Sequence, residues 1–189
     1  MDIQNRKLKR LKPVRFNIPG HAHELTFSCF KRLPLLKSLY VKQLMADSVN
    51  NAQTIHNFEV WAYVFMPEHV HIMIYPINEI YSISDILKSI KQSISRKFIN
   101  YCRWNKPQLL SHLETGLKSP RYRFWQDGTG YDRNYYGSEE ILKQIEYIHN
   151  NPVKRGLTDD PMKWRYSSAE FWIKGGYSPV IIRLDHFRK

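Results

Sequence analysis

The chain has few cysteines and no long apolar run. Its two cysteines, Cys29 and Cys102, form neither a CxxC pair nor a dense disulfide framework, which suits a reducing cytoplasm. No apolar run approaches the ~18 residues of a membrane span, and the N-terminus lacks the apolar core of a signal peptide. We therefore expect a cytoplasmic protein without membrane segments.

Acidic residues are also few. Lys plus Arg number 29 against 17 Asp plus Glu, which leaves a net charge of +12 over 189 residues. This excess favours a polyanionic partner such as nucleic acid. The length suits one domain with a substantial core. We expect a basic arm over residues 1–19, a folded domain over 20–175 and a tail over 176–189.

Strand and helix patterns alternate along the chain. Strands are predicted at 23–30, 58–66 and 69–75, a helix at about 35–57, and a second helix from Ser82 or Ser84 to about 102. Residues 103–121 are predicted to be a loop, 122–136 a strand or hairpin, and 179–184 a short strand. Ser138 should cap a last helix, which Pro152 should end. This order predicts an α+β, ferredoxin-like sandwich with a central antiparallel sheet and packed helices.

Basic residues that could contact nucleic-acid phosphates fall in four segments. They are Arg6, Lys7, Lys9 and Arg10 in the arm, Lys88, Lys91 and Arg96 in the second helix, Lys118, Arg121 and Arg123 further on, and Lys154 and Arg155 near the last helix. In the third segment they alternate with aromatic residues, which can stack on unpaired bases. For Trp125 a core position fits slightly better, and the arm fits a solubilising leader equally well.

Two histidines share one face of the strand after Pro67. His69 and His71 point to the side opposite Val70 and Ile72, about 6.6 Å apart along the strand. Such a pair can chelate a divalent metal ion. Pairs of this kind are more often exposed or hydrogen-bonded, and a metal site needs a third ligand that this motif does not supply.

Three motifs occur in a fixed order along the chain. They are Met66-Pro67-Glu68-His69-Val70-His71, then Phe124-Trp125-Gln126, then Tyr147-Ile148-His149-Asn150-Asn151-Pro152-Val153-Lys154-Arg155-Gly156-Leu157. Over about residues 20–172 they resemble the single-tyrosine HUH transposases and look closest to their REP-associated branch. The resemblance implies that His69 and His71 bind a metal, that Asn151 is a third ligand, and that Tyr147 is the nucleophile.

The resemblance also implies a reaction. The substrate would be single-stranded or hairpin DNA, the cofactor Mg²⁺ or Mn²⁺, the intermediate a 5′-phosphotyrosine, and the protein a monomer or homodimer. Metal on the histidines would offset charge that develops on the phosphate. A tyrosine nucleophile would keep the cut end attached for rejoining.

Other hypotheses stay open. One is a nucleic-acid-binding module without chemistry, since ferredoxin-like sheets with basic, aromatic surfaces also bind RNA or DNA. Another is a zinc-stabilised protein that uses the two histidines and a cysteine. Without its motif, Tyr147 would be a half-buried helix residue, and Tyr135 and Tyr136 are backup nucleophiles. Glu68 is a candidate partner of a metal ligand, and His149 a packing or phosphate-contacting residue.

Overall fold

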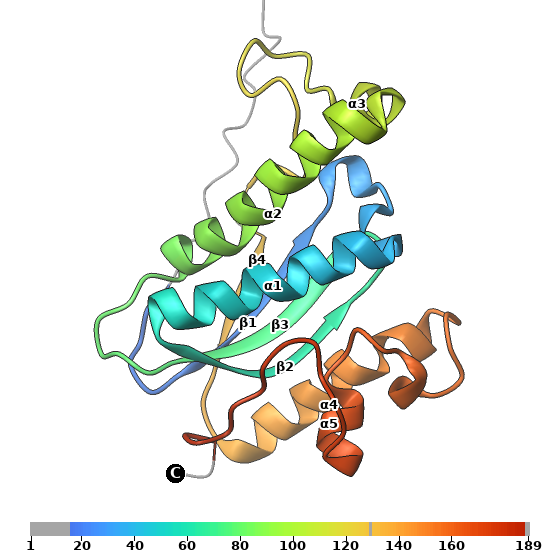
Figure 1. Cartoon of the computed structure of the whole chain (residues 1–189). Helices are drawn as coiled ribbons and strands as arrows, with labels where there is room; N and C mark the ends of the chain where they lie inside the picture. Colours follow the sequence, from blue (N-terminus) through green and yellow to red (C-terminus); the bar gives the residue numbers. More distant parts are fainter. Residues whose placement is uncertain (1–15, 129, 188–189) are drawn as a thin grey trace, which may run out of the picture.

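A computed structural model describes residues 16–128 and 130–187, so the predicted contacts of the basic arm lie outside the described residues. The centre is an antiparallel sheet of four strands in the order β2-β3-β1-β4 (Figure 1). The strands are β1 (Ala22–Ser28), β2 (Phe58–Phe65), β3 (His69–Pro76) and β4 (Tyr131–Tyr135). This confirms the α+β class and the ferredoxin-like arrangement predicted from the sequence.

Helices cover both faces of the sheet (Figure 1). Helices α1 (Leu39–His56) and α2 (Ile83–Asn105) lie on one face, and α4 (Ser138–Lys154) and α5 (Ala169–Lys174) lie on the other. Because side chains alternate along a strand, β3 contributes Val70, Ile72 and Ile74 to the core beneath α1 and α2. Met73 belongs to the second core, beneath α4. His69 and His71 therefore face α4.

The strand register sets which polar residues share the α4 face. His71 pairs with Thr26 on β1, and Thr26 pairs in turn with Tyr131 on β4. In the next row that faces α4, Glu24 pairs with Arg133. Directly paired residues point to the same side of a sheet. The α4 face thus carries a continuous polar strip from the centre of the sheet to its β4 edge.

Helix α4 differs at both ends from the prediction. Ser138 is the first helical residue rather than the cap, because Gly137 occupies the cap position. The helix also continues through Pro152 to Lys154. Proline has no N–H to give the carbonyl of Ile148, but the amide nitrogen of Asn151 donates to that oxygen at 3.4 Å and to the Tyr147 carbonyl at 2.9 Å. The Asn151 side chain thus restores the bond that Pro152 cannot make.

The predicted loop at 103–121 is wrong in its first half. Helix α2 runs to Asn105, and a further helix, α3, spans Pro107–Leu113. Pro107 is tolerated because it occupies the first turn, where its missing N–H has no helical partner. Leu113 is fully buried in the core beneath α1 and α2, so packing stabilises a helix that the proline at its start made hard to predict.

Smaller differences concern the ends of other elements. The predicted first helix begins at Leu39 instead of about residue 35, because its first residues form a 3₁₀ turn, η2 (Leu35–Lys37). Another 3₁₀ turn, η1 (Phe30–Arg32), lies before it, and a third, η3 (Pro161–Lys163), precedes α5. The predicted strand at 179–184 is absent, although the Arg183 N–H donates to the Val60 carbonyl at 3.3 Å. The C-terminal segment also places His186 on Glu59 and Phe187 against Trp61. No helix in the described part of the chain could cross a membrane.

Candidate active site

His69 and His71 lie side by side beneath α4. Their Nε2 atoms are 3.2 Å apart, and each residue is 8% exposed. Two imidazole nitrogens bound to one ion at about 2.1 Å would be separated by about 3.0–3.4 Å for bond angles between 90° and the tetrahedral value. The observed separation falls within this range, so the pair fits a shared metal ion.

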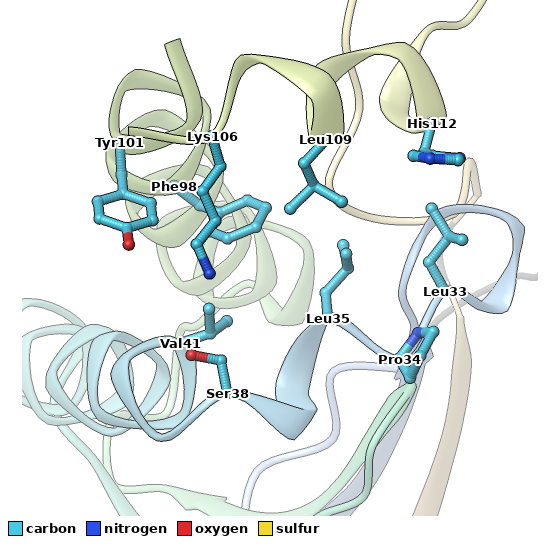
Figure 2. A pocket seen from close by; sticks show the side chains of 10 residues that line it. All are labelled: Leu33, Pro34, Leu35, Ser38, Val41, Phe98, Tyr101, Lys106, Leu109 and His112. Carbon is cyan, nitrogen blue, oxygen red and sulfur yellow. The ribbon is translucent and has the colours of Figure 1, made fainter. Parts of the chain in front are cut away.

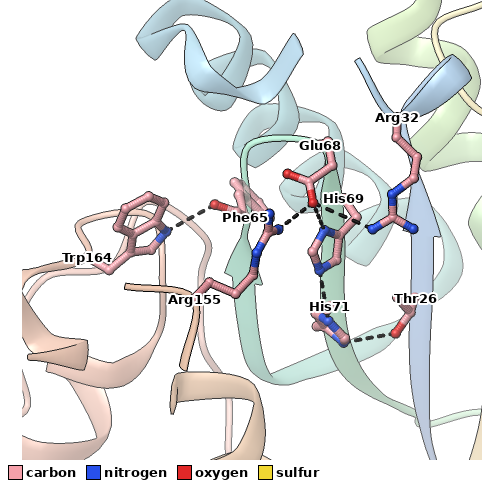
Figure 3. A network of polar contacts seen from close by, with 8 residues as sticks. All are labelled: Thr26, Arg32, Phe65, Glu68, His69, His71, Arg155 and Trp164. Carbon is pink, nitrogen blue, oxygen red and sulfur yellow. Dashed lines mark hydrogen bonds and ion pairs between the residues drawn. The ribbon is translucent and has the colours of Figure 1, made fainter. Parts of the chain in front are cut away.

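The second nitrogen of each ring is held by a neighbouring oxygen (Figure 3). His69 Nδ1 lies 3.1 Å from Glu68 Oε1. His71 Nδ1 lies 2.9 Å from Thr26 Oγ1 and 3.3 Å from Glu24 Oε1. A ring whose Nδ1–H donates to a carboxylate has its lone pair on Nε2, the atom that would bind the metal. Glu68 thus has the geometry predicted for a partner of a metal ligand.

Glu68 also joins the histidine strand to the end of α4. The Arg155 guanidinium donates to Glu68 Oε1, and Arg32 lies 3.6 Å from the same oxygen (Figure 3). Burial opposes ionisation of Glu68, but the hydrogen bond from Arg155 and the neighbouring His69 outweigh it and lower the pKa of this carboxyl. Burial, with His71 close by, lowers the pKa of His69 to about 4. His69 is therefore neutral near pH 7, the form that binds metals.

A complete set of metal ligands is not formed by acidic, histidine and cysteine side chains alone. Over residues 16–128 and 130–187, no three such residues come close enough to share an ion. Asn151 is 8% exposed and uses only its nitrogen in the bonds to its own helix. Cys29 and Cys102 are buried in the core on the opposite side of the sheet, where burial raises the pKa of the Cys29 thiol to about 12. That placement gives no support to a zinc site built from these cysteines.

Tyr147 stands on α4 directly beside the histidine pair. Its ring centroid is 6.1 Å from that of His71, and the two planes are inclined at 84°. The residue is 42% exposed, and the Lys154 ammonium lies 4.3 Å from its ring centroid. Tyr147 also borders a pocket of about 350 Å³ that His71 and Gln144 share. A phosphate in this pocket would meet the phenol and the imidazole together.

The two backup tyrosines have other partners. The Tyr135 hydroxyl is buried and donates to Glu24 Oε2 at 3.1 Å. Burial, with the Glu24 carboxylate close by, raises its pKa. Tyr136 is 76% exposed and stacks on His21, with ring centroids 5.3 Å apart. Only Tyr147, of these three tyrosines, contacts a histidine of the pair.

The predicted phosphate-contacting residues do not all lie at the candidate site. Lys154 and Arg155 lie at the candidate site, on Tyr147 and Glu68 respectively. Helix α2, with Lys88, Lys91 and Arg96, covers the opposite face of the sheet (Figure 1). The side chains of Lys88, Arg96 and Lys118 are exposed. The Lys91 ammonium donates to the Gly128 carbonyl. Arg121 forms an ion pair with Glu114, and Arg123 forms one with Asp127.

Glu24, Thr26 and Arg133 lie at the site although no sequence motif marks them. The alternation within β1 could have placed Glu24 and Thr26 on one face, but only the register brings them to His71. Trp125 is buried, as its core interpretation predicted, and its indole donates to the Lys91 carbonyl. The apolar spacing of the last helix predicts a buried stripe that includes Leu142, but Leu142 is 46% exposed. His149 is buried against Ser168 and is a packing residue.

A second pocket lies in the α1 and α2 layer, away from the histidine pair. It measures about 310 Å³ and is lined mainly by apolar side chains, including Leu35, Phe98 and Leu109 (Figure 2). Lys106 and His112 are its only basic side chains among the residues drawn. With a single imidazole, this pocket lacks the pair of imidazoles found beneath α4. The candidate chemistry therefore belongs to the α4 side.

The chain thus combines a ferredoxin-like sheet with a buried histidine pair and a neighbouring helical tyrosine, and comparison with known proteins assigns it to a family. The model of the family described as "Transposase IS200 like" matches residues 20–151. The chain belongs to this family.

Individual proteins that resemble this chain are also tyrosine transposases by name. The REP-associated tyrosine transposase of Escherichia coli K12 is 25% identical over 152 residues, which cover 79% of this chain and 76% of that protein. A Haemophilus influenzae protein named for the same class is 24% identical over 147 residues, covering 73% of this chain and 78% of its own. The fold matches a solved REP-associated tyrosine transposase bound to a REP hairpin, with a TM-score of 0.67, 21% identity and 91% of each chain covered.

Proposed function

We propose that this transposase cuts and rejoins single-stranded DNA at or near a hairpin, with Tyr147 as the nucleophile. The observation that carries the proposal is the contact between Tyr147 and His71 within one chain. A phenol beside a pair of nitrogens that can hold a metal ion has a placement suited to nucleophilic attack on a phosphodiester.

The reaction exchanges one phosphate ester for another. Tyr147 Oη would bond to phosphorus while the bond from phosphorus to the 3′ oxygen breaks, giving a 5′-phosphotyrosine and a free 3′ hydroxyl. The phenol proton would pass to solvent, which reaches this partly exposed side chain, and the departing oxygen would take up a proton. Because the new ester conserves the bond energy, a 3′ hydroxyl can attack it in reverse without ATP.

Each nearby side chain has a defined task in this proposal. Glu68 and Glu24 orient the two imidazoles, and Lys154 places positive charge beside the attacking ring. His69, His71 and the oxygen of Asn151 would hold Mg²⁺ or Mn²⁺, which when bound supplies Lewis-acid stabilisation of the phosphate charge. Since Tyr147 reaches the pair in cis, one chain would hold the residues that the reaction needs.

Support for a hairpin substrate comes from the solved relative, which is bound to a REP hairpin. Support for nucleic acid in general comes from the net charge of +12, because cationic proteins gain affinity by displacing counterions from phosphates.

A covalent-adduct assay tests the proposal. The protein is incubated with single-stranded oligonucleotides that carry imperfect palindromes from around its own gene, with Mg²⁺ or Mn²⁺, and run on a denaturing gel. Wild type and the Tyr136→Phe control should form an adduct, and Tyr147→Phe should form none. Equal adduct from Tyr147→Phe would refute the assigned nucleophile. A different outcome would identify a binding module without chemistry. In that case the protein would bind DNA tightly with or without chelator and form no adduct, and the double variant His69→Ala, His71→Ala would bind equally well.

A further inference from the structure

A pocket of about 350 Å³ opens between β4 and α4, beside the proposed nucleophile. Tyr147 and His71 form one side of this pocket, and Tyr131, Arg133 and Gln144 line the rest with β1 residues. Its size falls near the lower end of the range of about 300–1,000 Å³ found for small-ligand pockets. It can therefore accept one nucleotide-sized group next to the attacking phenol.

The register explains why β4 reaches this site. Tyr131 pairs with Thr26, which pairs with His71 in the same row of the sheet. Arg133 lies two residues further along β4 and so points to the same face. An edge strand with no sequence motif thus supplies one wall of the candidate active site.

The side chains of this wall suit a nucleotide. The Tyr131 ring is 50% exposed, and an exposed aromatic ring beside cations is a stacking surface for unpaired bases. The Arg133 guanidinium lies 4.9 Å from the Tyr135 ring and forms a 3.0 Å ion pair with Glu140. Both members of that pair are about half exposed, so the pair is weak and a phosphate can replace Glu140.

The acidic residue inside the pocket does not oppose this assignment. Glu24 is 3% exposed, and its two oxygens are engaged by His71 Nδ1 and the Tyr135 hydroxyl. Both of its carboxylate oxygens therefore already have partners within the protein. Gln144 adds an amide that can both donate to and accept from a base edge.

We propose that this pocket binds a nucleotide flanking the phosphate that Tyr147 attacks, with its base stacked on Tyr131 and a phosphate on Arg133. The assignment rests on the proposed function for its position next to the cut site. The binding itself needs no catalysis and can be tested separately.

The test uses photo-crosslinking on a protein that cannot react. A single-stranded oligonucleotide is selected from a random pool by binding to Tyr147→Phe in the presence of chelator. It is then prepared with 5-iodouracil at each position in turn, irradiated with the protein, and the crosslinked residue is found by mass spectrometry. Tyr131 should be crosslinked from one position or two adjacent ones. Crosslinks that map only to other residues, with binding intact, would overturn the proposal.

Affinity measurements on matched variants give a second readout. Tyr131→Ala should weaken binding roughly 5- to 150-fold, the range of one base–aromatic stack, whereas Tyr131→Phe keeps the ring and should bind like wild type. Tyr177→Ala, which removes a 71% exposed tyrosine elsewhere, is the control. Arg133→Gln should lower the salt dependence of binding, and Arg183→Gln should not. Equal affinity for Tyr131→Ala and wild type would reject the stacking role.

The two proposals can fail independently. If wild-type protein forms no covalent adduct but Tyr131 still crosslinks, the nuclease function is rejected and the nucleotide subsite stands. If the adduct forms and Tyr131 neither crosslinks nor affects affinity, the subsite is rejected and the nuclease function stands.

Discussion

The ring of Tyr147 meets the ring of His71 edge-on, with centroids 6.1 Å apart and planes at 84°, inside a single chain. Arg155, the residue that follows helix α4, makes a second link to the same strand by binding Glu68 next to His69. The helix and its C-terminal end therefore carry both the proposed nucleophile and a contact to the candidate metal-binding pair. A change that shifts α4 should disturb both together.

Glu68→Gln should weaken metal binding while preserving the fold. The carboxylate accepts from His69 Nδ1 and from Arg155, and a neutral amide orients the imidazole less strongly. Loss of such a partner typically costs about 10- to 100-fold in metal affinity. Titration with Mn²⁺ followed by calorimetry measures this, with Glu146→Gln on the exposed side of α4 as the control. Unchanged Mn²⁺ affinity would show that Glu68 does not position the ligand.

Two substitutions at Asn151 separate its two roles. Asn151→Ala leaves the Ile148 carbonyl without its side-chain donor and should cost about 1–3 kcal/mol of unfolding free energy. It should also reduce Mn²⁺ affinity if the oxygen is a ligand. Asn151→Asp loses the donor but keeps an oxygen, so it should lose stability and retain Mn²⁺ binding. Denaturant unfolding and calorimetry on both variants measure this; Mn²⁺ affinity unaffected in Asn151→Ala would exclude the metal role.

Much of the fold could be predicted because its elements have strong local patterns. The apolar stripe of α2 specifies a helix, and the two short apolar runs on either side of Pro67 specify the strands β2 and β3. Helix α3 has a much weaker pattern, because Leu113 is its one fully buried residue and Pro107 stands at its start. The continuation of α4 through Pro152 was missed because it depends on a side-chain bond from Asn151, which no propensity describes.

The site could be predicted only where a motif marks it. His69, His71 and Tyr147 lie in recognisable motifs, and the structure brings His71 and Tyr147 together. Glu24, Thr26, Tyr131 and Arg133 have no such mark, because they reach the site through strand register alone. Register depends on pairing between distant segments, which a single sequence does not reveal. The basic face of α2 was predicted, but its position opposite the histidines was not.

The basic residues of α2 and the basic residue beside Tyr147 should affect different steps, DNA binding in the first case and adduct formation in the second. In the double variant Lys88→Gln, Arg96→Gln, the slope of log affinity against log salt should fall by about 0.7 for each lost phosphate contact. Its rate of adduct formation at saturating DNA should match wild type, since α2 lies on the opposite face. Lys154→Gln should slow that rate roughly tenfold, equivalent to about 1.4 kcal/mol, because Lys154 lies beside the Tyr147 ring. Quenched-flow gels and salt titrations separate these effects; a slower rate in the α2 variant would contradict the assignment.

Stability should fall in mild acid because two buried histidines resist protonation. Burial lowers the pKa of His149 to about 4, and its Nε2 lies 2.8 Å from Ser168 Oγ. That oxygen accepts from the Tyr63 N–H. The single Ser168 hydroxyl proton can be donated to the Tyr63 carbonyl at 3.4 Å or, over the shorter distance, to a neutral imidazole. The pKa of His69 is also lowered to about 4.

The sign of the effect follows from which state binds the proton. As the pH falls below about 6.5, the ordinary pKa of histidine, the unfolded chain takes up protons that the folded chain excludes. Unfolding is then favoured until the folded state also protonates near pH 4, and each histidine contributes up to about 1.4 kcal/mol per pH unit across this window. His149→Gln removes one of the two groups, so its unfolding free energy should fall less steeply than that of wild type between pH 6.5 and 4. Urea unfolding in the presence of chelator at several pH values measures both slopes, and parallel curves would show that His149 does not exclude a proton in the folded state.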